Sequence, residues 1–234
     1  MSAACSLEEN MDFDYMQAIR DRHSVRSYLS DPIPEVSVAA LNDEITRCNA
    51  ISGLSMQLIT EEPDAFKGFL AHYGMLSGVK NYIALVGPKG PKLDELCGYY
   101  GERIVLLAQS MGLNTCWVAG TYSRRKCRAK IEKGQKLVCV IAIGKGKTSG
   151  VQSKSKSFDA VCKAEGEMPD WFRAGVECAL LAPTAINQQA FTFELMGSNA
   201  VLAKAGVGPC ANIDLGIVKL HFELGAGKEN FAWA

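Results

Sequence analysis

The fold of this chain is decided by Ala182-Pro183-Thr184-Ala185-Ile186-Asn187-Gln188-Gln189-Ala190-Phe191-Thr192-Phe193. A helical run at 171–181 precedes it and is expected to end there, because Pro183 has no backbone N–H and restricts the residue before it. An alternating strand at 191–195 follows. The small, hydroxyl and amide groups between helix and strand could bind a flat ligand with polar edges. By its spacing alone, the stretch also fits an ordinary helix-to-strand turn.

Charge and cysteine content narrow the possible functions. Lys plus Arg and Asp plus Glu both number 25 among 234 residues, which gives no field for nucleic acid or an acidic membrane, so neither is expected as a partner. The nine cysteines form no Cys-x-x-Cys and only three histidines are present, so no metal site is expected. The amino terminus lacks the apolar core of a signal peptide, and the apolar run at 137–144 is too short to span a bilayer. We therefore expect a cytoplasmic, reducing location.

Hydrophobic periodicity predicts a chain of mixed helices and strands. Asp12 is expected to cap the first helix, and Ser123 to cap a basic one. Further helices are predicted at 35–48, 64–72, 93–111, 158–164, 171–181 and 211–224, with strands at 56–60, 82–86, 137–144, 191–195 and 231–234. A Lys/Ser/Gly-rich segment without an apolar pattern separates a first part, 12–146, from a second, 158–234, and the linker itself is placed at 147–157.

A second notable stretch lies near the amino terminus, at Arg22-His23-Ser24-Val25-Arg26. Guanidinium groups make bidentate bonds to phosphate, so two arginines in this spacing could bind a phosphorylated ligand. Taken alone, basic residues that close a helix more often complement its dipole and face solvent. The stretch acquires a functional meaning only together with the one at 182–193.

The two stretches together resemble the FMN-dependent nitroreductase family. The family signature Ala-Pro-Ser-x-x-Asn-x-Gln-Pro-Trp-x-Phe is matched at 182–193, except that Thr184 replaces Ser and Ala190-Phe191 replaces Pro-Trp. The family's Arg-x-Ser-x-Arg/Lys is matched at 22–26, and its Gly-Leu-Gly-Thr-x-Trp is similar to Gly112-Leu113-Asn114-Thr115-Cys116-Trp117. The resemblance covers 12–225 and implies an α+β fold, with a central, mostly antiparallel sheet flanked by helices.

The resemblance also implies roles for particular residues. Arg22 and Ser24, with His23 between them, would meet the FMN phosphate, and Arg26 would lie near the N1 side of the ring. Lys154 and Lys156 resemble the basic pair that completes phosphate binding, although they are equally consistent with a solvated linker. The remaining candidates would line the ring or the ribityl chain: Trp117, Val118, Ala119, Gly120, Pro183, Thr184, Ala185, Asn187 and, more weakly, Gln189. Large aromatic residues are more often core than ligand contacts, so Trp117 is also a candidate for packing.

An internal repeat is suggested by the order of elements. The segment 42–60 parallels 173–195, and 98–120 parallels 212–233 without an exact register. The first half has lost the Pro and Asn of its own turn at 51–55, and the second half has no Arg-x-Ser. We interpret this as a fused pseudo-dimer with one flavin site, as in nitroreductases that carry a tandem half-repeat. Coincidental repetition of common helix–turn–strand units is the alternative.

The function implied by the resemblance is FMN-dependent oxidation of NAD(P)H. Hydride would pass through the flavin to a small-molecule acceptor, a nitroaromatic, a quinone or a similar compound. The chain would act as a monomeric pseudo-dimer or as a homodimer. The alternative is a catalytically degenerate protein of the same fold that binds flavin without turnover, or binds no flavin and serves in interactions.

Overall fold

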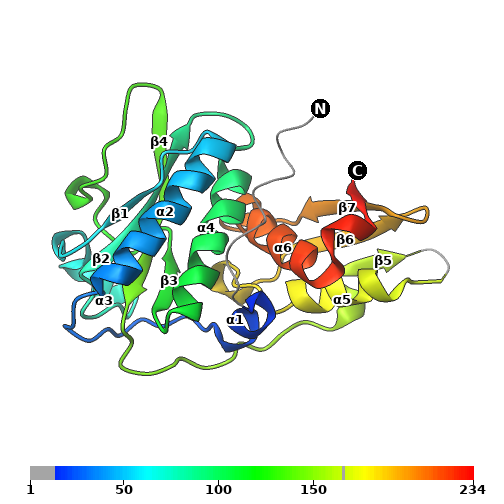
Figure 1. Ribbon diagram of the computed structural model, residues 1–234, viewed down its shortest axis with the longest axis horizontal. Helices are drawn as coiled ribbons and strands as arrows, with labels where there is room; N and C mark the ends of the chain where they lie inside the picture. The colour runs from blue at the N-terminus through cyan, green and yellow to red at the C-terminus, as the bar shows by residue number, and fades with distance from the viewer. Residues whose placement is uncertain (1–13, 165–166) are drawn as a thin grey trace.

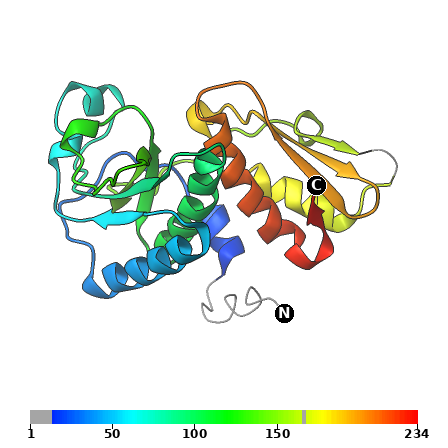
Figure 2. The same cartoon turned by 90° about the horizontal axis from the view of Figure 1, so that it is seen from above.

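Two four-stranded sheets lie on either side of a central pair of helices (Figures 1 and 2). This computed structural model describes residues 14–164 and 167–234. The first sheet has the order β1-β2-β4-β3 and is antiparallel throughout: β1 (Gln57–Ile59), β2 (Asn81–Pro88), β4 (Gln135–Gly144) and β3 (Asn114–Val118). The second sheet has the order β5-β6-β7-β8: β5 (Cys162–Ala164), β6 (Phe191–Met196), β7 (Ala200–Ala205) and β8 (Ala232–Trp233). Only its β6–β7 pair is antiparallel.

The helices cover these sheets and fill the space between them. The α-helices are α1 (Tyr15–Asp21), α2 (Glu35–Ser52), α3 (Phe69–Tyr73), α4 (Leu93–Ser110), α5 (Asp170–Ala179) and α6 (Ala211–Ala226). Helices α4 and α6 pack against each other, and α1 contacts both. Short 3-10 turns occur at Asp64–Phe66, Arg124–Lys126, Phe158–Ala160, Ala185–Asn187 and Lys228–Asn230. No helix of the described residues is long and apolar enough to cross a bilayer.

The first sheet is buried on both faces. Ile83 and Leu85 of β2 belong to the core shared with α2 and α4, whereas Tyr82, Ala84 and Val86 belong to a second apolar cluster on the opposite face. A strand covered on both sides has no reason to alternate polar and apolar residues. This explains why the apolar runs at 82–86 and 137–144 predict strands without alternation.

Contacts between α4 and α6 are reciprocal. Gly98 and Gly216 are each the sixth residue of their helix. A Cβ added at Gly98 would meet the carbonyl oxygen of Ile213 at 2.0 Å, and one at Gly216 would meet that of Glu95 at 1.9 Å. Glu95 and Ile213 each lie three residues before the glycine of their own helix. The same patch of each helix therefore contacts the same patch of the other, as at a twofold interface.

The predicted α+β class, with antiparallel strands flanked by helices, is confirmed, but several details are corrected. The strands form two sheets instead of one central sheet, and β7 has no predicted counterpart. The segment 158–164 is a 3-10 turn followed by β5, because the open edge of β6 offers residues 162–164 a parallel partner. The proposed cap Asp12 lies outside the described residues; Asp14 caps α1 by accepting a hydrogen bond from the backbone N–H of Gln17.

The basic helix predicted after Ser123 is also wrong. Only Arg124–Lys126 forms a 3-10 turn, and Ser123 makes no side-chain cap. The Arg124 guanidinium donates to the carbonyls of Leu137 and Val138, and Lys130 is hydrogen-bonded through both backbone groups to the side chain of Gln57. These bonds to neighbouring strands hold the segment extended in place of a helix.

Candidate functional site: a two-part groove between the halves

Two adjoining cavities form one groove between the first and second halves of the chain. One has a volume of about 340 Å³ and the other about 410 Å³, the size range of small-molecule sites. Ser24 and Arg26 of the first half and Pro183, Thr184 and Ile186 of the second line both cavities. We call the first cavity the polar part and the second the apolar part of the groove.

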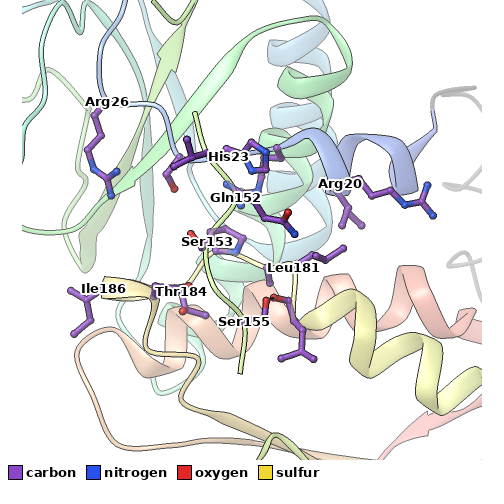
Figure 3. A pocket seen from close by; sticks show the side chains of 17 residues that line it. Arg20, His23, Arg26, Gln152, Ser153, Ser155, Leu181, Thr184 and Ile186 are labelled. Atoms are coloured by element: carbon purple, nitrogen blue, oxygen red, sulfur yellow. Dashed lines mark hydrogen bonds between the residues drawn. The ribbon is translucent and has the colours of Figure 1, made fainter. Parts of the chain in front are cut away.

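The polar part brings together the first motif, the linker and the Pro183 turn. His23, Gln152 and Ser153 lie along one side of the groove, Thr184 and Ile186 lie across from them, and Arg26 stands at one end (Figure 3). Arg22, Ser155 and Asn187 also line this part. Hydroxyl groups and cations gathered around one concave space suit a phosphate or another polyanion.

Ser24 and Arg26 point into the groove because their segment runs along the edge of β3. Ser24 pairs in parallel with Thr115, and the backbone N–H of Val25 donates to the Thr115 carbonyl at 3.0 Å. Val25 itself is buried in the apolar cluster beneath the sheet. Alternation along an extended segment therefore turns Ser24 and Arg26 to the side opposite Val25.

Arg22 differs from the other cations of the groove because it is almost completely buried. Its side chain is 7% exposed, and its Nε lies 3.7 Å from Oε1 of Glu102 on α4. Burial lowers the pKa of the Arg22 guanidinium, an effect that the Glu102 carboxylate opposes. Nε makes no hydrogen bond within the described part of the chain. Arg22 thus lines the groove and is also paired with a buried acid.

Glu102 connects Arg22 to both halves of the molecule. Its carboxylate accepts a hydrogen bond from the Trp117 indole N–H at 2.9 Å, and its Oε1 lies 3.0 Å from Nε2 of His221 on α6. Both Glu102 and His221 are fully buried. Neither residue was predicted from the sequence. A sequence feature could have pointed to them: each is a polar residue among the apolar positions of a largely buried helix. An unpaired charge there would be costly, so a partner is expected.

The turn after Pro183 has an unusual backbone. Ile186, Asn187 and Gln189 have φ angles of 49°, 55° and 42°, a conformation that residues with a Cβ seldom adopt. Asp214, near the amino end of α6, holds the turn by accepting hydrogen bonds from the Ala185 backbone N–H at 3.0 Å and the Gln188 side chain at 2.8 Å. Burial raises the pKa of the Asp214 carboxyl, and these donors partly offset the rise. Asp214 was not predicted either.

Gln189 and Lys156 join the linker to this turn and do not line the groove. Gln189 is 2% exposed; its Oε1 accepts from the Lys156 backbone N–H at 2.6 Å, and its Nε2 donates to the Leu180 carbonyl at 2.9 Å. The Lys156 ammonium donates to the Gln189 carbonyl. Lys154 offers its own carbonyl to the Asn187 side chain. The linker presents Ser153 and Ser155 to the groove instead of the two predicted lysines.

The apolar part is lined by the predicted ring-side segments and by others that were not predicted. Trp117, Val118, Ala119 and Gly120 line it from the first half, with Pro183, Thr184 and Ala185 from the second. Trp117 also packs against the main core, as expected if it contributes to packing as well as to the groove. The unpredicted lining includes residues 73–76 at the end of α3 and just beyond it, Cys116 and Cys139 in the first sheet, and the start of α6 with Pro209 before it. Thr121 and Ile186 line it as well. No cluster of His, Cys, Asp and Glu able to hold a metal is found among the described residues.

Comparisons with known proteins place the chain in a family. The family model described as "Putative TM nitroreductase" matches residues 14–226. The fold is similar to that of a putative nitroreductase from Thermotoga maritima, with a TM-score of 0.65 and 22% identity over 97% of this chain and 90% of that one. It is also similar to a putative nitroreductase in complex with FMN from Desulfovibrio desulfuricans, with a TM-score of 0.52 and 17% identity over 68% of this chain and all of that one. No curated protein matches the sequence. The chain belongs to this nitroreductase family.

Proposed function

We propose that the chain is an FMN-dependent NAD(P)H oxidoreductase that reduces nitroaromatic compounds, quinones or similar acceptors. The observation that carries the proposal is the two-part groove, in which hydroxyl and cationic groups surround one end and apolar groups the other. This division suits FMN, which has a phosphate at one end and a largely apolar ring system at the other. When bound, the flavin would supply hydride transfer from the nicotinamide to the acceptor.

Different residues of this chain would hold different parts of the cofactor. Arg22, His23, Ser24, Ser153 and Ser155 would hold the phosphate, and residues 117–120 and 183–185 would hold the ring. Arg26 lines both parts and is exposed, so it would supply a cation beside the ring, where negative charge develops on reduction. Asn187, at the rim of the polar part, would meet the ribityl chain. The groove walls would orient the flavin and keep water from it.

We further propose that the chain is a fused pair of half-repeats, 12–146 and 158–234, joined by a linker at 147–157, with the flavin site built within one chain. The reciprocal glycine contacts of α4 and α6 support this. Hydrogen bonds also join the two parts across this helix pair, at positions that are not equivalent in the register of the two glycines. Glu102 of α4 contacts Trp117 and, on the other helix, His221, and Glu223 of α6 accepts from Trp233 and, on the other helix, Tyr99.

A spectroscopic experiment tests the proposed function. The purified chain is reconstituted with FMN, freed of excess, and mixed anaerobically with NADH or NADPH while the visible flavin band is followed. We expect flavin to be retained and then bleached by at least one of the two donors, and its colour to return when a quinone is added. Retained flavin that neither donor bleaches would favour the degenerate binding protein, and failure to retain flavin would contradict the proposal altogether.

A further inference from the structure

The positive charge of the chain is concentrated in one exposed segment. Residues 124–136 contain seven of the 25 Lys and Arg residues and one acid, Glu132. All seven cations are exposed: Arg124, Arg125, Lys126, Arg128, Lys130, Lys133 and Lys136. Because the chain as a whole has no net charge, its remaining residues carry an excess of acids. The zero net charge, from which no anionic partner was expected, therefore conceals a strongly basic surface.

The fold neutralises only part of this charge. Arg125, Lys126 and Lys133 make no ion pair within the described ranges 14–164 and 167–234. The ion pairs of the segment join a nitrogen to an oxygen at 3.2 Å between Lys130 and Glu132, 3.7 Å between Lys136 and Asp94, and 3.9 Å between Arg128 and Glu62. Hydrogen bonds to the neighbouring strands hold the segment in place, so like charges stay side by side. An anionic partner would relieve their mutual repulsion.

Two exposed apolar side chains accompany the cations. Ile131 is 48% exposed within the segment, and Phe69, the first residue of α3, is 79% exposed. The turn before α3 lies against the basic segment, because the Ser123 N–H donates to the Ala65 carbonyl at 2.7 Å. Both segments lie at the end of the molecule away from the second sheet (Figures 1 and 2). Neither Phe69 nor any of residues 124–136 lines the groove, so this surface is separate from the proposed flavin site.

The field of these cations already acts on a carboxylate of the fold. The pKa of the Asp64 carboxyl is lowered, first by its hydrogen bond to the Lys67 ammonium at 2.8 Å and then by the charges of Lys126 and Arg128. Lys67 is itself exposed, on the segment that leads into α3. Cations of two segments therefore act together on an anion at this surface, as they would on a phosphate.

We propose that Lys67, Phe69 and residues 124–136 form a basic face that docks the protein on a membrane surface rich in anionic phospholipids. The headgroup phosphates neutralise the cations, and Phe69 and Ile131 enter the boundary between headgroups and acyl chains. Ile131 has no ring on which a nucleic-acid base could stack, so the apolar side chains of the face favour lipid.

The basic face adjoins the groove, although it does not line it. The Arg124 guanidinium donates to the carbonyl of Ala119 at 3.4 Å, and Ala119 lines the apolar part of the groove. Docking therefore brings the groove close to the bilayer surface. It requires neither bound flavin nor a helix that crosses the membrane.

Replacing two of the unpaired cations tests the electrostatic contribution. Each cation near an anionic surface contributes about a fivefold factor in affinity, so Arg125→Gln combined with Lys126→Gln should weaken binding to anionic vesicles about 25-fold. Lys145→Gln combined with Lys147→Gln is the matched control, because both lysines are exposed and lie beyond the opposite end of β4. We expect the control to bind within about twofold of the wild type, since salt screens charges that are far from the contact.

Replacing the exposed aromatic residue tests the apolar contribution. Phe69→Ser should weaken binding to anionic vesicles about tenfold, because an aromatic side chain no longer enters the lipid boundary. Val36→Ser is the matched control, since Val36 is 77% exposed on α2, and it should bind like the wild type. All of these variants should melt close to the wild-type temperature, because the substituted side chains are exposed.

The measurement is co-flotation of the full chain with phosphatidylcholine vesicles, with and without phosphatidylglycerol, at increasing salt. We expect binding only to the vesicles that contain phosphatidylglycerol, and a decline as salt screens the cations. Absence of binding to those vesicles at low salt would overturn the proposal, and so would equal binding to both kinds. A loss as large in the control variants would show that the basic face is not the contact. Tighter binding to a DNA duplex than to the vesicles, under the same conditions, would assign the face to nucleic acid instead.

Discussion

Asp214 shows how one buried carboxylate can fix a strained turn. It accepts hydrogen bonds from the backbone of Ala185 and the side chain of Gln188, so it opposes relaxation of the left-handed residues between and beyond them. Burial raises its pKa above the ordinary value of 3.8, which means that the folded protein binds this proton more tightly than the unfolded chain does. The favourable contribution is complete below pH 3.8 and is lost as the pH rises through the folded-state pKa.

The first prediction follows from the direction of the Asp214 pKa shift. The stability of the wild type relative to an Asp214→Asn variant should be greatest below pH 3.8 and should decline as the pH rises above that value. Parallel thermal melts of the two proteins across the acid range measure the difference, in which other titrating groups cancel. A difference that grows with pH would show that the Asp214 pKa is lowered by folding instead.

The two arginines of the first motif should behave differently. Arg22 is buried beside Glu102, so Arg22→Ala should lower the melting temperature. It should also weaken FMN binding by about 2–3 kcal/mol, because a charge-assisted contact to the phosphate is lost. Arg26 is exposed in the groove, so Arg26→Ala should leave stability nearly unchanged and make the flavin midpoint potential more negative.

FMN titration, thermal melts and potentiometry on the two variants check this second prediction. Arg20→Ala is a suitable control, since Arg20 is exposed at the edge of the polar part and points away from Arg26 (Figure 3). Small and equal effects from all three substitutions would mean that these arginines only complement the dipole of α1.

Short sequence motifs predict some of the residues at this site but not others. Ser24 and the residues 183–185 were predicted because a compact motif carries them, and they do line the groove. Glu102, His221 and Asp214 were missed because each acts on a residue more than twenty positions away in the chain. Lys154 and Lys156 do not line the groove, whereas Ser153 and Ser155 do, and a linker without an apolar pattern does not reveal which of its residues face inward.

At the scale of elements, the crossing of α4 and α6 depends on two glycines. A Cβ at either Gly98 or Gly216 would lie about 2 Å from a carbonyl oxygen of the other helix, a separation that side-chain movement cannot relieve. The helices would have to move apart, and the groove, which α6 helps to line, would change with them.

The third prediction is that Gly98→Ala and Gly216→Ala each destabilise the fold by about 3 kcal/mol, the upper end for overpacking. Because the contacts are reciprocal, the two losses should be similar. Gly90→Ala is the control, since nothing lies within 4 Å of a Cβ at that position. Urea unfolding of the three variants measures the effect. A loss at only one of the two glycines would contradict the equivalence of the two contacts.

The elements best predicted are those whose signal lies within their own residues. The strand at 137–144 and the helix at 93–111 are long and apolar, and both are present as β4 and α4. β5 and β7 were missed because a three-residue edge strand and a strand in which every third residue or more is alanine have little strand preference of their own. They form because β6 offers a hydrogen-bonding edge on each side. Pairing of this kind depends on the assembled sheet.

For the whole molecule, the fourth prediction concerns the number and assembly of flavin sites. Both walls of the groove belong to one chain, and the turn at 51–55, which we propose as the counterpart of the Pro183 turn, lacks its Pro and Asn. The protein should therefore bind about one FMN per chain, and occupancy should not fall when the protein is diluted through the micromolar range. Released flavin counted against protein, at several dilutions, measures both. Two flavins per chain would contradict the loss of the second site, and flavin release in step with dissociation of a dimer would show that the site is shared.

The reciprocal contact of α4 and α6 bears on how the two helices can change in evolution. In a homodimer, one gene encodes both sides of the interface, so a mutation that suits one side is imposed on the other. Here Glu102, four residues after Gly98, is a buried acid, whereas Leu220, four residues after Gly216, is a buried aliphatic residue. A single chain can hold a carboxylate on one side and an aliphatic side chain on the other because each position is encoded separately. Natural selection can then act on one half of the interface while the other half stays as it was.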